Sequence, residues 1–166
     1  MSSQRVMSSI ALIDTSIFLN VLNVPHCNQF RDKVLQDFKD YTKAGCTFLL
    51  PMATILETGN HIAQNGDGNQ RRKTAQSFVC TIQQSFSGES PWQPIDFPSP
   101  QAISTWLHQF PDLAGQNKSS KKLEGTSFGD LTIIQDFKKT CQRFPLREVF
   151  IWSLDQDLAK YHQPPK

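Results

Sequence analysis

The segment IALIDTSIFLNVL, residues 10–22, determines how the rest of this sequence is interpreted. It opens with four consecutive apolar residues, a pattern typical of a short buried strand. The run is interrupted by Asp14, Thr15 and Ser16 before more apolar residues follow. A buried carboxylate is costly unless a hydrogen bond or a cation compensates it. Asp14 therefore either caps the turn after the strand or holds a cation.

The composition is typical of a globular protein. The chain has 166 residues, of which 38% are hydrophobic, and a formal net charge of +2. We expect a single domain over residues 1–166. The apolar runs are too short to span a membrane, and the start MSSQRVMSS lacks the apolar core of a signal peptide. We therefore expect a cytoplasmic protein with no membrane partner. Four widely spaced cysteines indicate reduced thiols rather than a disulfide or zinc framework.

Segments rich in β-forming residues alternate with helical patterns along the chain. Strands are expected at 10–14, 46–50, 95–97 and 149–153, and helices at about 26–44, from 51, around 75–86, from 99, over 126–144 and at the end. This alternation predicts an α/β fold, a three-layer α/β/α sandwich with a mainly parallel sheet of four or five strands. The polar segment at about 111–125, rich in Lys and Ser, is expected to be a mobile loop.

Four carboxylates are expected to gather at one edge of this sheet. Asp14 and Asp155 each follow a predicted strand, and the carboxyl ends of parallel strands meet at the same edge. Glu57 lies in the helix after the second strand and Asp130 in the first turn of the late helix. Taken singly, each has a structural explanation, such as the capping pattern Ser127-x-x-Asp130. Together they would repel one another unless a cation neutralises them, and Mg²⁺ or a similar divalent ion suits oxygen ligands.

Basic residues gather in two segments, RRK at 71–73 and KSSKK at 118–122. Either segment is explained equally well as solvated surface. An acidic metal site flanked by basic residues is also the expected layout for cutting a phosphodiester, because the metal generates hydroxide and the cations hold the flanking backbone. The candidate nucleic-acid-binding residues are Arg71, Arg72, Lys73, Lys118, Lys121 and Lys122.

Four motifs of the sequence, ALIDTSIFLNVL, PMATILETGNHIA, GTSFGDLTII and VFIWSLDQDL, resemble the acidic motifs of PIN-domain nucleases in their order and spacing. The resemblance covers about residues 10–160. It implies that the catalytic carboxylates Asp14, Glu57, Asp130 and Asp155 bind Mg²⁺ or Mn²⁺. It also implies that Thr15 or Ser16, together with Ser153, orients this cluster through hydroxyl hydrogen bonds. Asp157 offers a second carboxylate for the role of Asp155, which we favour because it continues the Ser-x-Asp pattern.

Many PIN domains of this size are toxin ribonucleases of bacterial toxin–antitoxin pairs, which cut single-stranded RNA and often dimerise. The resemblance therefore implies single-stranded RNA as substrate, with an antitoxin protein and a second copy of the chain as further partners. The chain departs from this pattern in its longer 111–125 segment and in YHQPPK, which leaves little room for a final edge strand.

Two alternatives to an endoribonuclease remain open. One is a PIN-like scaffold that binds nucleic acid without catalysis, and the other is a DNA-acting nuclease of defence or repair. A metal cluster of this kind recognises phosphate, so the sequence does not separate ribose from deoxyribose. Trp92, Trp106 and Phe128 are aromatic residues that could stack on bases, although Trp106 lies on an apolar helical stripe typical of a core.

Overall fold

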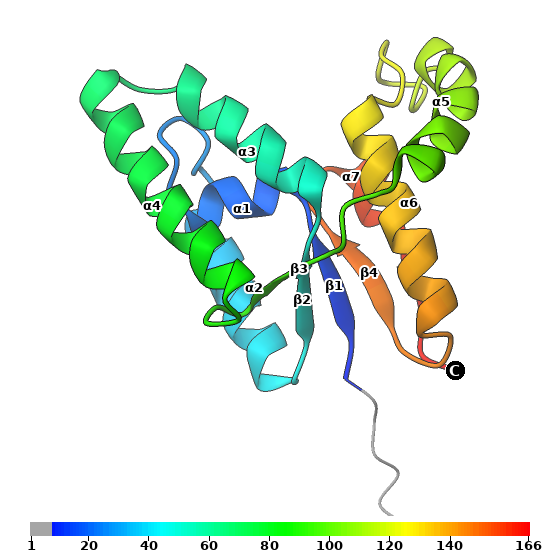
Figure 1. Cartoon of the computed structure of the whole chain (residues 1–166), viewed down its shortest axis with the longest axis horizontal. Coiled ribbons are helices and arrows are strands. Elements are labelled where there is room, and N and C mark those ends of the chain that lie inside the picture. Colours follow the sequence, from blue (N-terminus) through cyan, green and yellow to red (C-terminus); the bar gives the residue numbers. More distant parts are fainter. Residues whose placement is uncertain (1–7) are drawn as a thin grey trace, which may run out of the picture.

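The structure, a computed structural model that describes residues 8–166, is built on a five-stranded sheet (Figure 1). Its strand order is β3-β2-β1-β4-β5, where β1 is Ile10–Ile13, β2 is Thr47–Leu50, β3 is Trp92–Pro94, β4 is Val149–Trp152 and β5 is His162–Gln163. The first four strands are parallel, and β5 pairs antiparallel to β4. The α/β class and the mainly parallel sheet predicted from the sequence are therefore confirmed.

Strand β1 lies in the middle of the sheet, and both of its faces are covered. All four of its side chains are at most 1% exposed. Alternate residues belong to different core clusters, with Ala11 and Ile13 in one and Ile10 and Leu12 in the other. A parallel strand buried on both faces has a continuous apolar sequence, which explains the IALI that precedes Asp14.

Helices lie on both sides of the sheet (Figure 1). On one side are α1 (Thr15–Val21), α2 (Arg31–Lys43) and α4 (Gly68–Phe86), and on the other are α5 (Pro100–Gly115), α6 (Phe128–Arg143) and α7 (Gln156–Ala159). Helix α3 (Met52–Gln64) begins at the carboxyl edge of the sheet and leads to α4. This arrangement is compatible with a three-layer sandwich.

The third strand is Trp92–Pro94 rather than the expected 95–97. Trp92 is 5% exposed, and its ring lies 5.4 Å from the Phe48 ring and 4.9 Å from the Phe38 ring. This aromatic packing fixes the register of the strand, whereas Phe97 remains exposed. Trp92 is thus a core residue, and stacking on bases is ruled out for it.

Two helix boundaries also differ from the sequence prediction. Helix α2 begins at Arg31 rather than near residue 26, because Asn23 and His26 have positive φ values of 56° and 63° and extend the turn. Helix α5 continues through Pro111 to Gly115, so the loop expected over 111–125 is shorter. The end of α5 is held by tertiary contacts: Phe110 packs on Phe128, and the Leu113 carbonyl accepts a hydrogen bond from the Thr126 N–H.

The two ends of the chain concern the expectations about a final edge strand and about a signal peptide. After the last acidic motif there is room for β5, although it is only two residues long. The stretch MSSQRVM, on which the expectation of no signal peptide depends, lies outside the described residues. Within residues 8–166, no helix combines the length and the apolar character needed to cross a bilayer.

Candidate acidic site at the carboxyl edge of the sheet

The carboxyl ends of β1 and β4 bring Asp14 and Asp155 to the same edge of the sheet. The two strands pair in register as far as Ile13 and Trp152, and the Asp14 N–H continues the ladder by donating to the Trp152 carbonyl at 3.0 Å. Helix α3 is tied to this edge because the buried Thr54 hydroxyl donates to the Ile13 carbonyl at 2.7 Å. The carboxyl ends of β1 and β4 and the start of α3 therefore lie at one edge of the sheet, the edge at which the candidate carboxylates were expected.

The Asp14 carboxylate is buried and held by two hydroxyl groups. It is 5% exposed, and its Oδ2 accepts hydrogen bonds from Ser16 Oγ at 2.9 Å and from Ser153 Oγ at 2.6 Å. Asp14 occupies the N-cap position of α1, yet its side chain makes no capping hydrogen bond. The capping role is therefore wrong for the Asp14 side chain. Its hydroxyl contacts are of the kind that the family resemblance implies.

Glu57 reaches the same edge from the second turn of α3. Its Oε2 accepts a 3.0 Å hydrogen bond from the Thr15 hydroxyl. Its Oε1 lies against Gly129, where a Cβ atom would overlap with it, so the missing side chain makes room for the carboxylate. Burial raises the pKa of Glu57, the Thr15 hydrogen bond opposes this, and the charges of Asp130 and Asp14 raise it further. Glu57 is thus electrostatically coupled to two other candidate ligands.

Asp130 lies in the first turn of α6, where its backbone is used for capping and its side chain is free for another role. Its N–H donates to the Ser127 hydroxyl, the N-cap of the helix, at 3.1 Å. Burial raises the pKa of the Asp130 carboxyl, Lys118 opposes this, and the charges of Asp14 and Asp155 raise it. The Lys118 ammonium lies 3.0 Å from Oδ2.

Asp155 and Asp157 share one lysine. Lys122 Nζ lies 3.0 Å from Asp155 Oδ1 and 2.7 Å from Asp157 Oδ2. Burial alone would raise the pKa of Asp155, but the hydrogen bond from the Asp157 N–H and the contact with Lys122 hold it below its ordinary value. The two carboxylates raise the pKa of Lys122 in turn. We refer to Asp14, Glu57, Asp130, Asp155 and Asp157 as the acidic cluster.

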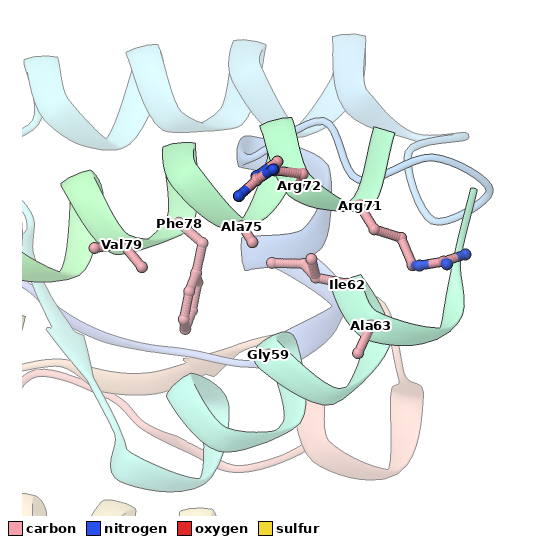
Figure 2. A pocket seen from close by; sticks show the side chains of 8 residues that line it. All are labelled: Gly59, Ile62, Ala63, Arg71, Arg72, Ala75, Phe78 and Val79. Atoms are coloured by element: carbon pink, nitrogen blue, oxygen red, sulfur yellow. The ribbon is translucent and has the colours of Figure 1, made fainter. Parts of the chain in front are cut away.

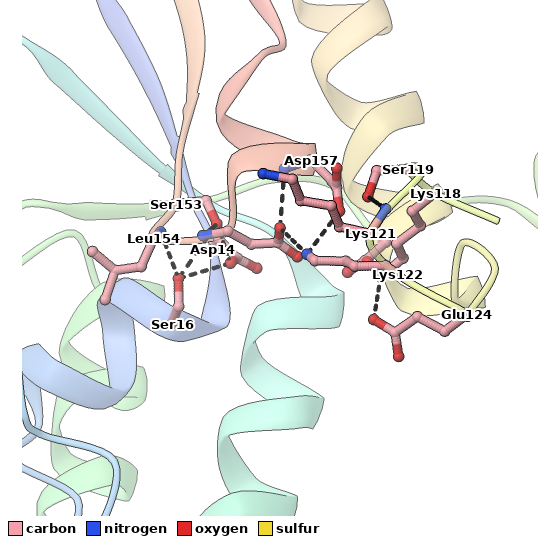
Figure 3. A network of polar contacts seen from close by, with 12 residues as sticks. Asp14, Ser16, Lys118, Ser119, Lys121, Lys122, Glu124, Ser153, Leu154 and Asp157 are labelled. Carbon is pink, nitrogen blue, oxygen red and sulfur yellow. Dashed lines mark hydrogen bonds and ion pairs between the residues drawn. The ribbon is translucent and has the colours of Figure 1, made fainter.

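The segment that joins α5 to α6 lies over the acidic cluster (Figure 3). A bridge between Ser119 and Lys122 forms a tight turn in it, and Lys118 is buried to a side-chain exposure of 10%. Two of the predicted phosphate-binding lysines therefore contact the carboxylates directly instead of lying at the rim. The sequence has no periodic signal for this contact, because the path of a loop depends on distant partners. Lys121, between them, forms no ion pair within the part of the chain that the structure describes.

The other predicted basic segment lies elsewhere. Arg71, Arg72 and Lys73 are in the first turns of α4, beyond the end of α3 that is far from the sheet (Figure 1). The Arg71 guanidinium donates to the Gly66 carbonyl at 2.6 Å. Figure 2 shows both arginines beside a groove with apolar walls between α3 and α4. This segment is not brought together with the acidic cluster.

The side-chain oxygens of the cluster are hard donors of the kind that Mg²⁺ and Mn²⁺ prefer. Burial is the main cause of the raised pKa values of Glu57 and Asp130, and the charges of neighbouring carboxylates raise them further, a repulsion that a cation would relieve. Among residues 8–166, however, no three His, Cys, Asp or Glu side chains are grouped closely enough to hold one ion. The cations that the outer carboxylates contact are instead Lys118 and Lys122.

Comparison of the chain with family models, curated proteins and solved structures yields no match. The resemblance to PIN domains therefore rests on the four sequence motifs alone.

Proposed function

We propose that the protein is a PIN-like endoribonuclease that uses Mg²⁺ or Mn²⁺ to hydrolyse phosphodiester bonds of single-stranded RNA at the acidic cluster. The observation that carries this proposal is the buried Asp14 carboxylate, held by Ser16 and Ser153 rather than used as a helix cap. The two hydroxyl groups satisfy hydrogen bonds of this carboxylate but supply no positive charge, and a buried charge is costly unless it is also paired with an opposite charge or a metal ion. The mutual repulsion of Glu57, Asp130 and Asp14 points to a cation for the same reason.

Each residue of the cluster has a role in this proposal. Asp14, Glu57, Asp130 and Asp155 are the residues that would hold the metal, which when bound supplies a nucleophilic hydroxide and screens the phosphate charge. Ser16 and Ser153 fix the orientation of Asp14, and Thr15 fixes that of Glu57. Gly129 keeps space open for Glu57 beside α6. Asp157 shares Lys122 with Asp155 and takes the outer position.

Lys118 and Lys122 take a second role as the cations nearest to the substrate. Their ammonium groups already lie at the cluster, so RNA phosphates that enter it meet positive charge without a large movement of the loop. Arg71, Arg72, Lys73 and Lys121 extend the basic surface for longer RNA. An antitoxin protein and a homodimer belong to the same proposal as partners, and a cytoplasmic location goes with them.

The test is cleavage of a fluorescent single-stranded RNA by the whole chain in Mn²⁺, in Mg²⁺ and in EDTA. We expect cleavage in a divalent metal and none in EDTA or in Asp14→Asn. Asp32→Asn, an exposed residue of α2, is the matched control. Cleavage of a DNA strand of the same sequence is measured in parallel. Cleavage of RNA alone indicates an endoribonuclease, and cleavage of DNA alone indicates a DNA-acting nuclease. RNA binding without cleavage in any metal would leave the scaffold as the correct interpretation.

A further inference from the structure

A second buried carboxylate lies outside the acidic cluster. Asp136, in the middle of α6, is 6% exposed, and no residue within 8–166 donates a hydrogen bond to its side chain. Burial raises its pKa to about 6, although Lys139 opposes the shift. The side chain is largely buried, but its oxygen atoms are not among the fully buried polar atoms without a partner, so they remain reachable from the cavity. A carboxylate in this position favours a ligand that supplies N–H or O–H groups.

Asp136 lines a cavity of about 400 Å³ between α6 and the β2–β3 edge of the sheet. Leu49, Ile95 and Phe144 form apolar parts of its wall. Helix α5 packs against the start of α6 through Phe110 and Phe128, whereas the α6 residues that line the cavity come from the second half of that helix. Its volume lies within the range of small-molecule sites. Asp136 is six residues beyond Asp130, about 9 Å along the helix axis, so this site is separate from the acidic cluster.

Two cations that line this cavity form no ion pair with any residue from 8 to 166. Arg147 is committed to the backbone, since its guanidinium donates to the Ser8 carbonyl at 2.6 Å and to the Ser9 carbonyl at 3.3 Å. Lys139 and Arg143 form no ion pair with any residue of the described chain. The lining of the cavity thus combines a buried acceptor, apolar walls, and two cations without an ion-pair partner, of which Arg143 lies over the Phe144 ring.

We propose that this cavity binds a guanine nucleotide, with Asp136 accepting hydrogen bonds from the base and Lys139 and Arg143 contacting the phosphate. A carboxylate only accepts hydrogen bonds, and guanine alone among the common bases presents two adjacent donors, N1–H and the 2-amino group. Adenine and cytosine turn a ring acceptor toward the carboxylate, and uracil has a single N–H between two carbonyls. The lining carries three cations, Lys139, Arg143 and Arg147, against two carboxylates, Asp96 and Asp136, so its net positive charge disfavours a cationic ligand.

The guanylate can come from two sources, a free mononucleotide or one residue of an RNA chain. The proposal does not depend on the nuclease activity, because the cavity and the acidic cluster share no residue. Both sources are tested by titration calorimetry of the whole chain in EDTA. The probes are GMP, IMP, AMP, CMP and UMP, and a single-stranded oligonucleotide with one guanosine, compared with the same strand carrying inosine there.

We expect GMP, the guanosine oligonucleotide or both to bind about tenfold more tightly than the matched probes without a 2-amino group. GMP binding identifies a free nucleotide as ligand, and selective binding of the oligonucleotide alone identifies RNA. Asp136→Asn should abolish this preference, because its amide N–H₂ opposes the donors of guanine. Lys139→Gln should weaken the binding of GMP and AMP alike, and it should leave unchanged the binding of the nucleoside guanosine, which is added as a probe without a phosphate.

Asp32→Asn, a carboxylate substitution on the exposed side of α2, is the control that should bind like wild type. Circular dichroism checks that Asp136→Asn is folded. If Asp136→Asn is not folded, two other results decide the proposal. These are the affinities of wild type for GMP and IMP, and the nucleotide affinities of the Lys139→Gln variant. Equal binding of guanine and inosine probes, or unchanged GMP affinity in folded Asp136→Asn, would overturn the proposal.

Discussion

The Lys118 ammonium lies 3.0 Å from Asp130 Oδ2, so a cation of this chain already contacts a carboxylate of the acidic cluster. Lys122 makes the equivalent contacts with Asp155 and Asp157. These lysines offset part of the repulsion among the carboxylates, which is also what a divalent ion would do. Under the proposed function, lysines and metal therefore compete for the same oxygen atoms.

This competition predicts tighter metal binding when the lysines are removed. The double variant Lys118→Gln/Lys122→Gln should bind Mn²⁺ a few fold more tightly than wild type, because the carboxylates no longer have to give up an ion pair when the metal binds. Titration calorimetry gives the dissociation constants. Lys121→Gln is a matched control from the same turn and should bind Mn²⁺ as wild type does. Unchanged affinity in the double variant would show that the lysines do not compete.

The same lysines should bind RNA phosphates. Replacing Lys118, Lys121 and Lys122 with Gln should weaken single-stranded RNA binding regardless of sequence and lower the salt slope by about 0.7 for each phosphate that the variant no longer neutralises. Arg71, Arg72 and Lys73, replaced together, should have a smaller effect because they lie beyond α3. Fluorescence anisotropy at several salt concentrations measures both. If the RNA affinity of wild type does not change with salt concentration, neither segment contacts RNA phosphates, and both are solvated surface.

Gly129 should be as important as a ligand, although it has no side chain. In Gly129→Ala the new Cβ would overlap with Glu57 Oε1 and displace that carboxylate from its present position. We expect Mn²⁺ affinity to fall about tenfold, the size of effect seen when residues that support metal ligands are changed. Gly115→Ala, where a Cβ meets nothing within 4 Å, is the matched control. Equal Mn²⁺ affinity in the two variants would remove Gly129 from the site.

Asp136 should make stability depend on pH. Its pKa is about 6 in the folded chain and about 3.9 in an unfolded one, so protons bind the folded state more tightly. The destabilisation, about 3 kcal/mol, is complete above pH 7 and diminishes as the pH falls toward 4. Asp96, Lys139, Arg143 and Arg147 also line the cavity and can modify the effect.

Asp136→Asn isolates this contribution. The variant should be more stable than wild type at pH 7.5, and its advantage should shrink by about 1 kcal/mol at pH 5. Urea unfolding at both pH values gives the free energies of unfolding. An advantage that does not change with pH would mean that Asp136 titrates normally.

The part of the site that follows from strand ends could be predicted, and the part that follows from loops could not. Asp14 and Asp155 are predictable because apolar runs mark β1 and β4, and parallel strands end at one edge. The contacts of Lys118 and Lys122 depend on how the loop is anchored, for example by the Thr126 N–H on the Leu113 carbonyl. No local pattern contains that information. The position of β3 escapes prediction for a similar reason, because Trp92 packs against residues distant in sequence.

The most decisive prediction concerns Asp14 itself. Asp14→Asn removes the charge but keeps an oxygen that can accept from Ser153, whose hydroxyl can rotate to suit it. Without metal, the variant should melt at or above the temperature of wild type, since one member of a mutually repelling cluster is gone. At a Mn²⁺ concentration about 100 times the dissociation constant, wild type should gain about 2.7 kcal/mol and the variant much less.

The measurement is a thermal melting series with and without Mn²⁺, paired with the RNA cleavage assay. Asp130→Asn should behave like Asp14→Asn, because both carboxylates belong to the mutually repelling set. If Asp155 is the ligand, Asp157→Asn should keep substantial activity and Asp155→Asn should not. If instead Asp155→Asn is active and Asp157→Asn is inactive, Asp157 is the ligand. If Asp14→Asn cleaves RNA as wild type does, or melts far lower with an unchanged response to Mn²⁺, then the Ser16 and Ser153 contacts serve the fold alone. The buried carboxylate after β1 would then be structural, and the proposed nuclease would lose its central residue.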